Sequence, residues 1–291
     1  MNLLNNGKQY PVFTRQQIQN LESSAIQQHG FKSYDLMQRA GKAAFMFIRE
    51  HYPDAKRVLV ITGGGNNAGD GYILARLLHT ADTECYTMPV VPITRLRGDA
   101  MRAQNDYAIH DGRDIDFTED LPECDLIVDA IFGIGLTRPV ENEFADIINA
   151  INHTPVPVLS LDIPSGLSAE TGNPMGPTVY ANSTLTFIGL KSGLITGESR
   201  NYTGKVGVDS LDLPDSVIEN AEKLGMSLSE TMPARLLSAR SQSGYKNLYG
   251  HVLVVGGNIG YPNAARLAGE AAARTGTGLV SVACHPNNVA A

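Results

Sequence analysis

The chain has 291 residues, 43% of them hydrophobic, which is typical of a globular protein with about two domains. It carries 23 lysine and arginine residues against 30 aspartate and glutamate residues, a formal net charge of −7. This acidic balance argues against nucleic acid or a membrane surface as a partner. Cys85, Cys124 and Cys284 lack metal-ligand spacing, and the sequence has no signal peptide or run of apolar residues long enough to span a bilayer. We therefore expect a cytoplasmic protein with reduced thiols.

The predicted elements begin with two helices, over residues 15–28 and 34–50, and Thr14 is the expected N-cap of the first. From residue 57 onward, strand and helix patterns alternate. Strands are predicted at 58–62, 85–91, 125–130, 156–161, 184–188 and 205–209, and helices at 71–79, 98–110 and 141–152. Apolar strands that alternate with helices predict an α/β fold, in which a doubly wound, Rossmann-like parallel sheet lies between two helical layers (three-layer αβα).

A second unit is predicted in the last part of the chain. Residues 216–243 are polar and mixed in composition, as expected of a linker. A further strand, an alanine-rich helix and another strand are predicted at 251–257, 263–275 and 279–283. One β-α-β unit cannot bury both faces of a sheet. We therefore expect a complete domain over 1–215 and only the beginning of a second domain over 244–291.

The most informative segment is the glycine-rich stretch 63–71 that follows the apolar strand Val58–Thr62. A strand, a glycine turn and a helix N-terminus in that order build an anion site from free backbone N–H groups. Asn66, Asn67 and Asp70 lie in the predicted turn, where packing gives no reason for them, so a ligand site is favoured over an unliganded turn. The stretch matches neither G-x-G-x-x-G nor the P-loop pattern well.

Three further predicted strands also end in polar side chains. Asp129 precedes the glycine-containing segment Gly133–Pro139, Asp162 precedes Ser165, and Lys191 follows the next apolar run. Each has an ordinary alternative, since an aspartate can cap a turn, a glycine can form one, and a lysine can be a solvated charge. The carboxyl ends of parallel strands meet at one edge of a sheet. We therefore expect all four groups to face one ligand.

Some of these groups are oxygen donors suited to a hard monovalent cation. They are the amide oxygen of Asn67, the carboxylate of Asp129 and the hydroxyl of Ser165. No cluster of histidine and cysteine competes for zinc or another soft metal. The sequence therefore predicts a monovalent cation site at this edge.

Three motifs, Asn66–Gly71, Asp129–Leu136 and Asp162–Leu167, occur in the order found in the NAD(P)H-hydrate epimerase family, the YjeF N-terminal domain, which residues 1–215 resemble. The resemblance implies interconversion of the R and S forms of hydrated NADH and NADPH. It also implies potassium at Asn67, Asp129 and Ser165. The residues it implies for substrate binding are Asn66, Asn67, Ala68, Gly69, Asp70, Gly133, Ile134, Gly135, Leu136, Thr137, Arg138, Pro139 and Asp162. Many relatives carry glycine at position 68.

Residues 245–291 resemble the opening of the ADP-dependent NAD(P)H-hydrate dehydratase domain, which has a ribokinase-like fold. The likeness is carried by Leu253–Gly257 and Arg274–Val280. The order of these two domains is similar to the domain order of bifunctional nicotinamide-nucleotide repair enzymes. The resemblance implies that a longer chain would also dehydrate the S form, using ADP and Mg²⁺, and that residues 245–291 lack the later catalytic motifs.

The chemistry of the hydrated cofactor suggests a route. Its hydroxyl carbon is bonded to the ring nitrogen, so nitrogen electrons can help to expel the hydroxyl as water, and water can return from the other face. We expect Asp162 to be the acid/base group, oriented or tuned by Lys191. Ring opening is an alternative route.

Other functions are also open to this sequence. A non-catalytic nucleotide-binding or scaffold module is disfavoured by the presence of Asp162, Asp129 and the Asn66–Asn67 pair. A small-molecule kinase and an ordinary dehydrogenase fit less well. The choice between NADH and NADPH hydrates and the formation of a homo-oligomer are left open.

Overall fold

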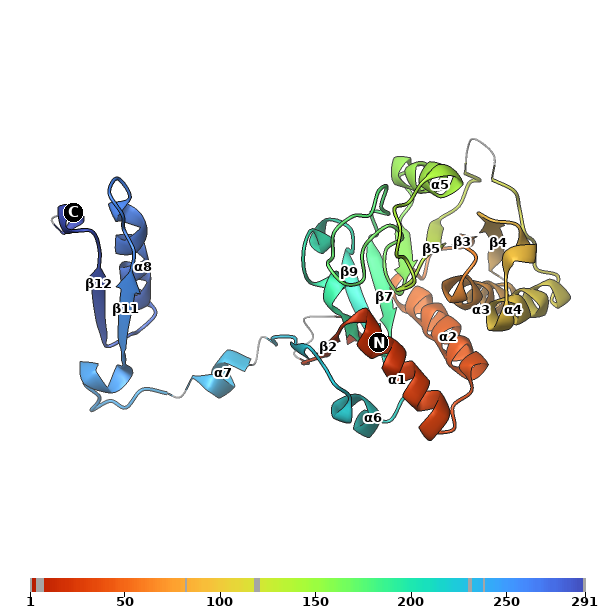
Figure 1. The fold of residues 1–291 in the computed structure, drawn as a ribbon. Coiled ribbons are helices and arrows are strands. Elements are labelled where there is room, and N and C mark those ends of the chain that lie inside the picture. Colours follow the sequence, from red (N-terminus) through yellow and green to blue (C-terminus); the bar gives the residue numbers. More distant parts are fainter. Residues whose placement is uncertain are drawn as a thin grey trace. The chain divides into compact units, whose positions relative to one another are not determined.

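The computed structural model describes residues 2–3, 8–81, 83–117, 121–229, 232–237 and 239–289. The chain divides into two compact units, Met1–Thr231 and Met232–Ala291 (Figure 1).

The first unit is organised around a sheet that has seven strands among the described residues, in the order β1-β9-β7-β6-β5-β3-β4. The strands are β1 (Asn2–Leu3), β3 (Arg57–Thr62), β4 (Glu84–Pro89), β5 (Leu126–Ala130), β6 (Val158–Leu161), β7 (Ser183–Phe187) and β9 (Lys205–Asp209). Strands β4, β3, β5, β6, β7 and β9 pair in parallel, and β1 pairs with β9 antiparallel. The predicted parallel sheet is confirmed.

Helices cover both faces of this sheet. One face carries α2 (Ser33–His51), α3 (Asn66–Thr80) and α4 (Gly98–Ile109), and the other carries α5 (Asn142–His153) (Figure 1). Successive side chains of β3 alternate between the two layers. Val58 and Val60 join the core under α2 and α3, whereas Leu59 and Ile61 pack with the apolar side of α5. Burial on both sides explains why these strands read as continuous apolar runs, and it confirms the three-layer prediction.

A small sheet, β10-β2-β8, was not predicted because its strands are only two or three residues long. It is formed by β2 (Pro11–Phe13), β8 (Leu190–Lys191) and β10 (Gly225–Met226), and Phe13 pairs with Lys191. Helix α1 (Arg15–Gln28) follows β2 and begins at the expected cap, Thr14. Helix α6 (Asp215–Asn220) and β10 belong to the first unit. The structure therefore divides the chain after residue 231, and the expected linker 216–243 begins inside the first unit.

The glycine-rich stretch differs from its prediction in one respect. Helix α3 begins at Asn66 instead of residue 71, with Gly65 as its N-cap. Gly63–Gly65 make the turn. Glycine is required at position 63, because a Cβ atom there would lie 2.1 Å from the carbonyl oxygen of Ile131. The interpretation of Asn66, Asn67 and Asp70 as turn residues was therefore wrong, since they lie in the first turns of the helix.

The second unit contains α7 (Met232–Leu236), β11 (His251–Val255), α8 (Pro262–Arg274) and β12 (Leu279–Ala283). Strands β11 and β12 pair in parallel, as the expected β-α-β unit requires. Short 3₁₀ turns lie at Ile93–Arg95, Ser192–Leu194, Ser199–Asn201, Lys246–Tyr249 and Pro286–Asn288. Throughout the described part of the chain, every helix is too short or too polar to cross a membrane.

Candidate active site

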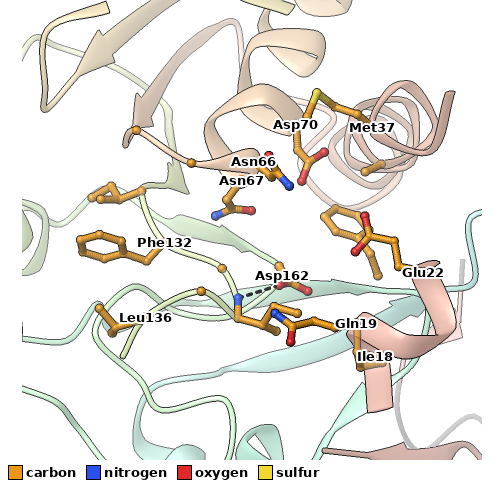
Figure 2. Close-up of a pocket in the computed structure, with 18 of the residues that line it drawn as sticks. Ile18, Gln19, Glu22, Met37, Asn66, Asn67, Asp70, Phe132, Leu136 and Asp162 are labelled. Carbon is orange, nitrogen blue, oxygen red and sulfur yellow. Dashed lines mark hydrogen bonds between the residues drawn. The ribbon is translucent and has the colours of Figure 1, made fainter. Parts of the chain in front are cut away.

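A cavity of about 550 Å³ lies at the carboxyl ends of the parallel strands in the first unit. Its volume is in the range of small-molecule sites, and open α/β sheets bind their ligands at this edge. Segments that follow β3, β4, β5, β6 and β7 all contribute to the lining, and α1 and α2 complete it (Figure 2). Most of the predicted substrate residues line it, namely Asn66, Asn67, Asp70, Gly133, Ile134, Gly135, Leu136, Thr137, Arg138 and Asp162.

Three predicted substrate residues do not line the cavity. Ala68 is fully buried, and Gly69 faces Met37 and Ala100 where α3 packs on its neighbours. Both positions lie on the side of α3 that faces away from the cavity, because only one side of a helix can line it. Pro139 is exposed beyond the end of the lining segment.

Asp162 and Lys191 form a buried ion pair at the cavity wall. The Lys191 side chain is 1% exposed, and its Nζ atom donates to Asp162 Oδ1, to Thr186 Oγ1 at 2.7 Å and to the carbonyl oxygen of Phe187 at 2.7 Å. These contacts use all three donors of the ammonium group. The interpretation of Lys191 as a solvated charge is therefore excluded. Its backbone is fixed by the pairing of β8 with β2.

The Asp162 carboxylate is oriented by further donors. Thr186 Oγ1 donates to Oδ1 at 3.3 Å, and the Ile134 backbone N–H donates to Oδ2 at 3.2 Å. The residue itself has φ +68°, a left-handed conformation that is rare for any residue with a side chain. Such backbone strain is concentrated at functional sites, where the surrounding structure enforces it. The turn after β6 therefore points this carboxylate into the cavity (Figure 2).

The Asp129 carboxylate, at the end of β5, is fully buried and has a different environment. Its oxygens accept from Ser165 Oγ at 2.5 Å, Ser160 Oγ at 2.8 Å, the Ser165 N–H at 2.8 Å and the Ile131 N–H at 3.3 Å. Burial raises the pKa of Asp129, and the bonds from Ser165 and Ser160 act in the opposite direction. The network ties the loops after β5 and β6 together.

Asn67 is the expected cation ligand with a free oxygen. Its Nδ2 donates to the carbonyl oxygen of Leu161 at 3.3 Å. Its Oδ1 is buried and has no hydrogen-bond partner among the described residues. A buried acceptor without a partner is costly, so this oxygen fits a ligand to a bound cation. Asp129 and Ser165, the other two expected ligands, are bonded to each other.

Two more carboxyl groups line the cavity, Asp70 from α3 and Glu22 from α1 (Figure 2). Burial and then the nearby Asp162 carboxylate raise the pKa of Asp70 well above its usual value, and Glu22 adds to the effect. Burial and Asp162 also raise the pKa of Glu22, while Lys191 lowers it. Sequence reasoning missed Glu22, because α1 has polar residues on several sides and only tertiary packing selects the inner one.

The cavity also has cationic and aromatic groups. Arg95 follows β4 and Arg138 follows β5, and both are exposed at the cavity wall. Phe132 and Phe144 line the cavity with ring centroids 4.7 Å apart. Arg95 and Phe144 were not predicted, and no motif in the sequence marks either. Guanidinium and aromatic groups suit a ligand that carries phosphates and a base.

The sequence is similar to characterised protein families over most of its length. Residues 33–193 match the family described as "YjeF-related protein N-terminus". The chain is 39% identical to the NAD(P)H-hydrate epimerase of Limosilactobacillus fermentum over 198 residues, which cover 67% of this chain and 94% of that protein. It is 38% identical to the bifunctional NAD(P)H-hydrate repair enzyme Nnr of Escherichia coli over 283 residues, 97% of this chain and 55% of the relative. The chain thus spans about half the length of such bifunctional relatives.

A comparison of folds gives a related result. The crystal structure of the yeast protein YNL200c (ynu0) aligns with a TM-score of 0.62 over 74% of this chain and 95% of the yeast chain, at 21% sequence identity. A likeness at this identity shows a shared fold, in agreement with the Rossmann-like architecture of the first unit.

Proposed function

Because the chain belongs to the family of YjeF-related protein N-termini, we propose that its first unit interconverts the R and S forms of hydrated NADH and NADPH. One observation carries the proposal: a carboxylate, Asp162, is held by the buried Lys191 at the wall of a cavity lined by all three family motifs. A scaffold module would have no need for a carboxylate that a left-handed backbone and a buried ammonium group hold at a cavity wall.

The proposed reaction begins with loss of the hydroxyl as water, assisted by the lone pair of the ring nitrogen. Water then adds to the other face of the same carbon. Asp162 accepts hydrogen bonds on both oxygens and points into the cavity, so it is placed to take a proton from the entering water. Lys191 acts as its positioning residue, because the ammonium group holds Oδ1, while Oδ2 accepts from the Ile134 N–H.

The remaining wall suggests how the dinucleotide binds. The N-terminus of α3 and the side chains of Arg95 and Arg138 are suited to the pyrophosphate. Phe132 and Phe144 offer aromatic faces for a base. The nicotinamide end then lies near Asp162, where carboxyl groups gather.

A potassium ion is proposed to bind beside this cavity. Asn67 Oδ1 supplies a buried oxygen without a partner, and the Asp129 carboxylate and Ser165 hydroxyl supply the other donors. When bound, the ion offsets negative charge near the phosphates and fixes the loops after β3 and β5.

The second unit is proposed to belong to an ADP-dependent dehydratase domain that takes ADP and Mg²⁺. Support comes from the bifunctional relatives of Escherichia coli and Coxiella burnetii, whose likeness covers 97% and 96% of this chain. We also propose a cytoplasmic setting, where the reduced nicotinamide nucleotides are used.

The proposal is tested by incubating pure R or S hydrate with the chain and following both forms by chiral chromatography. Wild-type protein and a shortened chain ending at Thr231 should both bring the two forms to equilibrium faster than buffer alone, because the site lies within the first unit. If both proteins fold and bind the hydrate without accelerating the interconversion, the site is a binding module and the proposal is wrong.

A further inference from the structure

Helix α1 carries into the cavity a carboxyl group that the mechanism above does not use. Ile18, Gln19 and Glu22 lie on one side of α1, and all three line the cavity. Glu22 is half-buried, and Figure 2 shows its carboxyl group directed toward Asp70. Among the described residues, Glu22 has no hydrogen bond or ion pair to hold its carboxyl group. An acidic side chain turned inward without a partner is costly unless it meets a ligand.

The charged groups around Glu22 favour its neutral form. Asp162 lies toward the sheet and Asp70 lies on α3, and both are acidic. Lys191 is the cation whose charge reaches Glu22, and all three of its donors are engaged by other groups. Helix α6, which packs against α1, carries the exposed acidic residues Asp215 and Glu219. The remaining charged residues at the cavity wall and at the N-terminus of α1 are Arg95, Arg138, Arg15 and Glu170.

Glu22 and Asp162 therefore lie in different environments. Asp162 accepts from an ammonium group, which suits an ionised proton acceptor, whereas the burial that raises the pKa of Glu22 suits a proton donor. A divalent metal site does not account for these carboxyl groups, because no cluster of acidic, histidine or cysteine side chains in the described parts of the chain has the arrangement to hold a metal. They are better suited to proton transfer.

Resting on the function proposed above, we propose that Glu22 is a second catalytic residue, which gives its proton to the departing hydroxyl while Asp162 takes one from the water that enters. The C–O bond breaks as the ring nitrogen lone pair forms a C=N⁺ bond, and the hydroxyl leaves as water with the Glu22 proton. An incoming water forms a new C–O bond on the other face, the C=N electrons return to nitrogen, and the extra proton passes to Asp162.

This sequence of steps neither oxidises nor reduces the substrate. It leaves Glu22 ionised and Asp162 protonated, and exchange of protons with solvent restores the starting state. In the reverse direction the two groups exchange roles. Two groups on different walls explain how one site can serve both faces of a ring that stays in place, because Glu22 comes from α1 and Asp162 from the sheet edge (Figure 2).

The test compares Glu22→Gln with Glu219→Gln in the full chain, using initial rates of R-to-S and S-to-R conversion from pH 5 to 9. Glu219 is exposed on α6 and outside the cavity, so the same chemical change there is a matched control. Glu22→Gln should lower kcat/KM about a hundredfold or more in both directions, the usual contribution of a general acid. In wild type, kcat/KM should fall at alkaline pH because Glu22 loses its proton. This alkaline fall should be absent in Glu22→Gln. Glu219→Gln should match wild type throughout.

A second variant guards against a merely structural effect. Glu22→Asp keeps the carboxyl group on a shorter side chain and should retain more activity than Glu22→Gln, together with the alkaline fall. Equal rates for Glu22→Gln and wild type would overturn the inference, as would an unchanged alkaline fall in a slowed Glu22→Gln variant. Both results leave the proposed epimerase standing if wild type is active, whereas an inactive wild type overturns the function itself.

Discussion

The loops after β5 and β6 start from the same sequence feature, an aspartate at the end of an apolar strand, yet the two aspartates have different surroundings. Asp129 is completely buried and accepts four hydrogen bonds from Ser160, Ser165 and Ile131. Asp162 is 9% exposed, lies at the cavity wall and shares Oδ1 with a buried ammonium group. The first carboxylate is enclosed by donors, while the second faces the cavity.

The difference separates a carboxylate enclosed by hydrogen-bond donors from one that lies at a cavity wall. Four accepted hydrogen bonds join the Asp129 carboxylate to β6 and to the loops after β5 and β6, so this group holds two loops in register. Asp162 keeps an oxygen directed at the cavity, and its left-handed backbone shows that the fold enforces this orientation. Substitutions at the two positions should therefore fail in different ways.

The largest expected effect follows from removing the cation that holds Asp162. Lys191→Met leaves a carboxylate with a 12% exposed side chain and no ammonium partner, which should lower the free energy of unfolding by about 3–5 kcal/mol. The double variant Asp162→Asn with Lys191→Met should recover a large part of that loss, because no charge is then left unpaired. Urea unfolding of wild type and the three variants measures this. A double variant no more stable than Lys191→Met would contradict the ion-pair description.

Asp129→Asn should give the next largest loss of stability. An amide cannot accept all the bonds that the carboxylate accepts, so at least one donor from Ser165 or Ser160 loses its partner, at a cost of about 1–3 kcal/mol. The exposed Asp146→Asn on α5 is the matched control and should unfold like wild type. Thermal unfolding in the same buffer compares them. Identical midpoints for both variants would mean that the hydrogen bonds to Asp129 do not stabilise the fold.

Asp70→Asn should stabilise the protein at neutral pH by a few degrees. The pKa of Asp70 is raised in the fold, so between its unfolded value near 4 and the higher folded value the folded state binds more protons than the unfolded state. Stability contributed by this group therefore falls as the pH rises through that window. The advantage of Asp70→Asn should be present at pH 7–8 and absent below about pH 4. A lower melting temperature for the variant at pH 8 would contradict the assigned direction.

The smallest effect is expected from the proposed potassium site. Melting temperature should be higher in potassium chloride than in tetramethylammonium chloride at the same ionic strength, because the larger ion does not fit among Asn67, Asp129 and Ser165. The difference should disappear in Asn67→Ala, which removes the oxygen that has no protein partner. Equal melting temperatures of wild type in the two salts would count against the site.

The sheet was predictable because burial on both faces leaves a clear mark in the sequence. Strands β3 and β5 are mostly apolar, and polar side chains lie at or just after the ends of β3, β5, β6 and β7, at the edge where the cavity lies. Asp129, Asp162 and Lys191 were predicted as site residues from their places at the ends of predicted strands. Strands β2, β8 and β10 leave no comparable mark, since two or three residues show no periodicity.

The parts of the site that were missed depend on tertiary packing. The start of α3 was misplaced because glycines and asparagines are typical of turns, although Asn66 begins a helix directly after Gly65. Glu22 lies far from the strand ends in sequence, and the packing of α1 alone brings it to the cavity. The sequence assigned Asp162 to acid/base chemistry and Asp129 to a cation, but it could not show which donors surround each carboxylate, because those donors come from other strands and loops.

The contrast between the two aspartates is tested most directly by the rate of interconversion of R and S hydrates in Asp162→Asn and Asp129→Asn, each measured at a temperature where circular dichroism shows it to be folded. Asp162→Asn should lose about a hundredfold or more in rate, as expected for removal of a general acid/base, and should also melt below wild type, because it leaves the buried Lys191 ammonium group without its anion. Asp129→Asn should also melt below wild type and, with saturating potassium, keep a rate within about tenfold of wild type. Near wild-type turnover by a folded Asp162→Asn variant would contradict the account and assign the chemistry to another group.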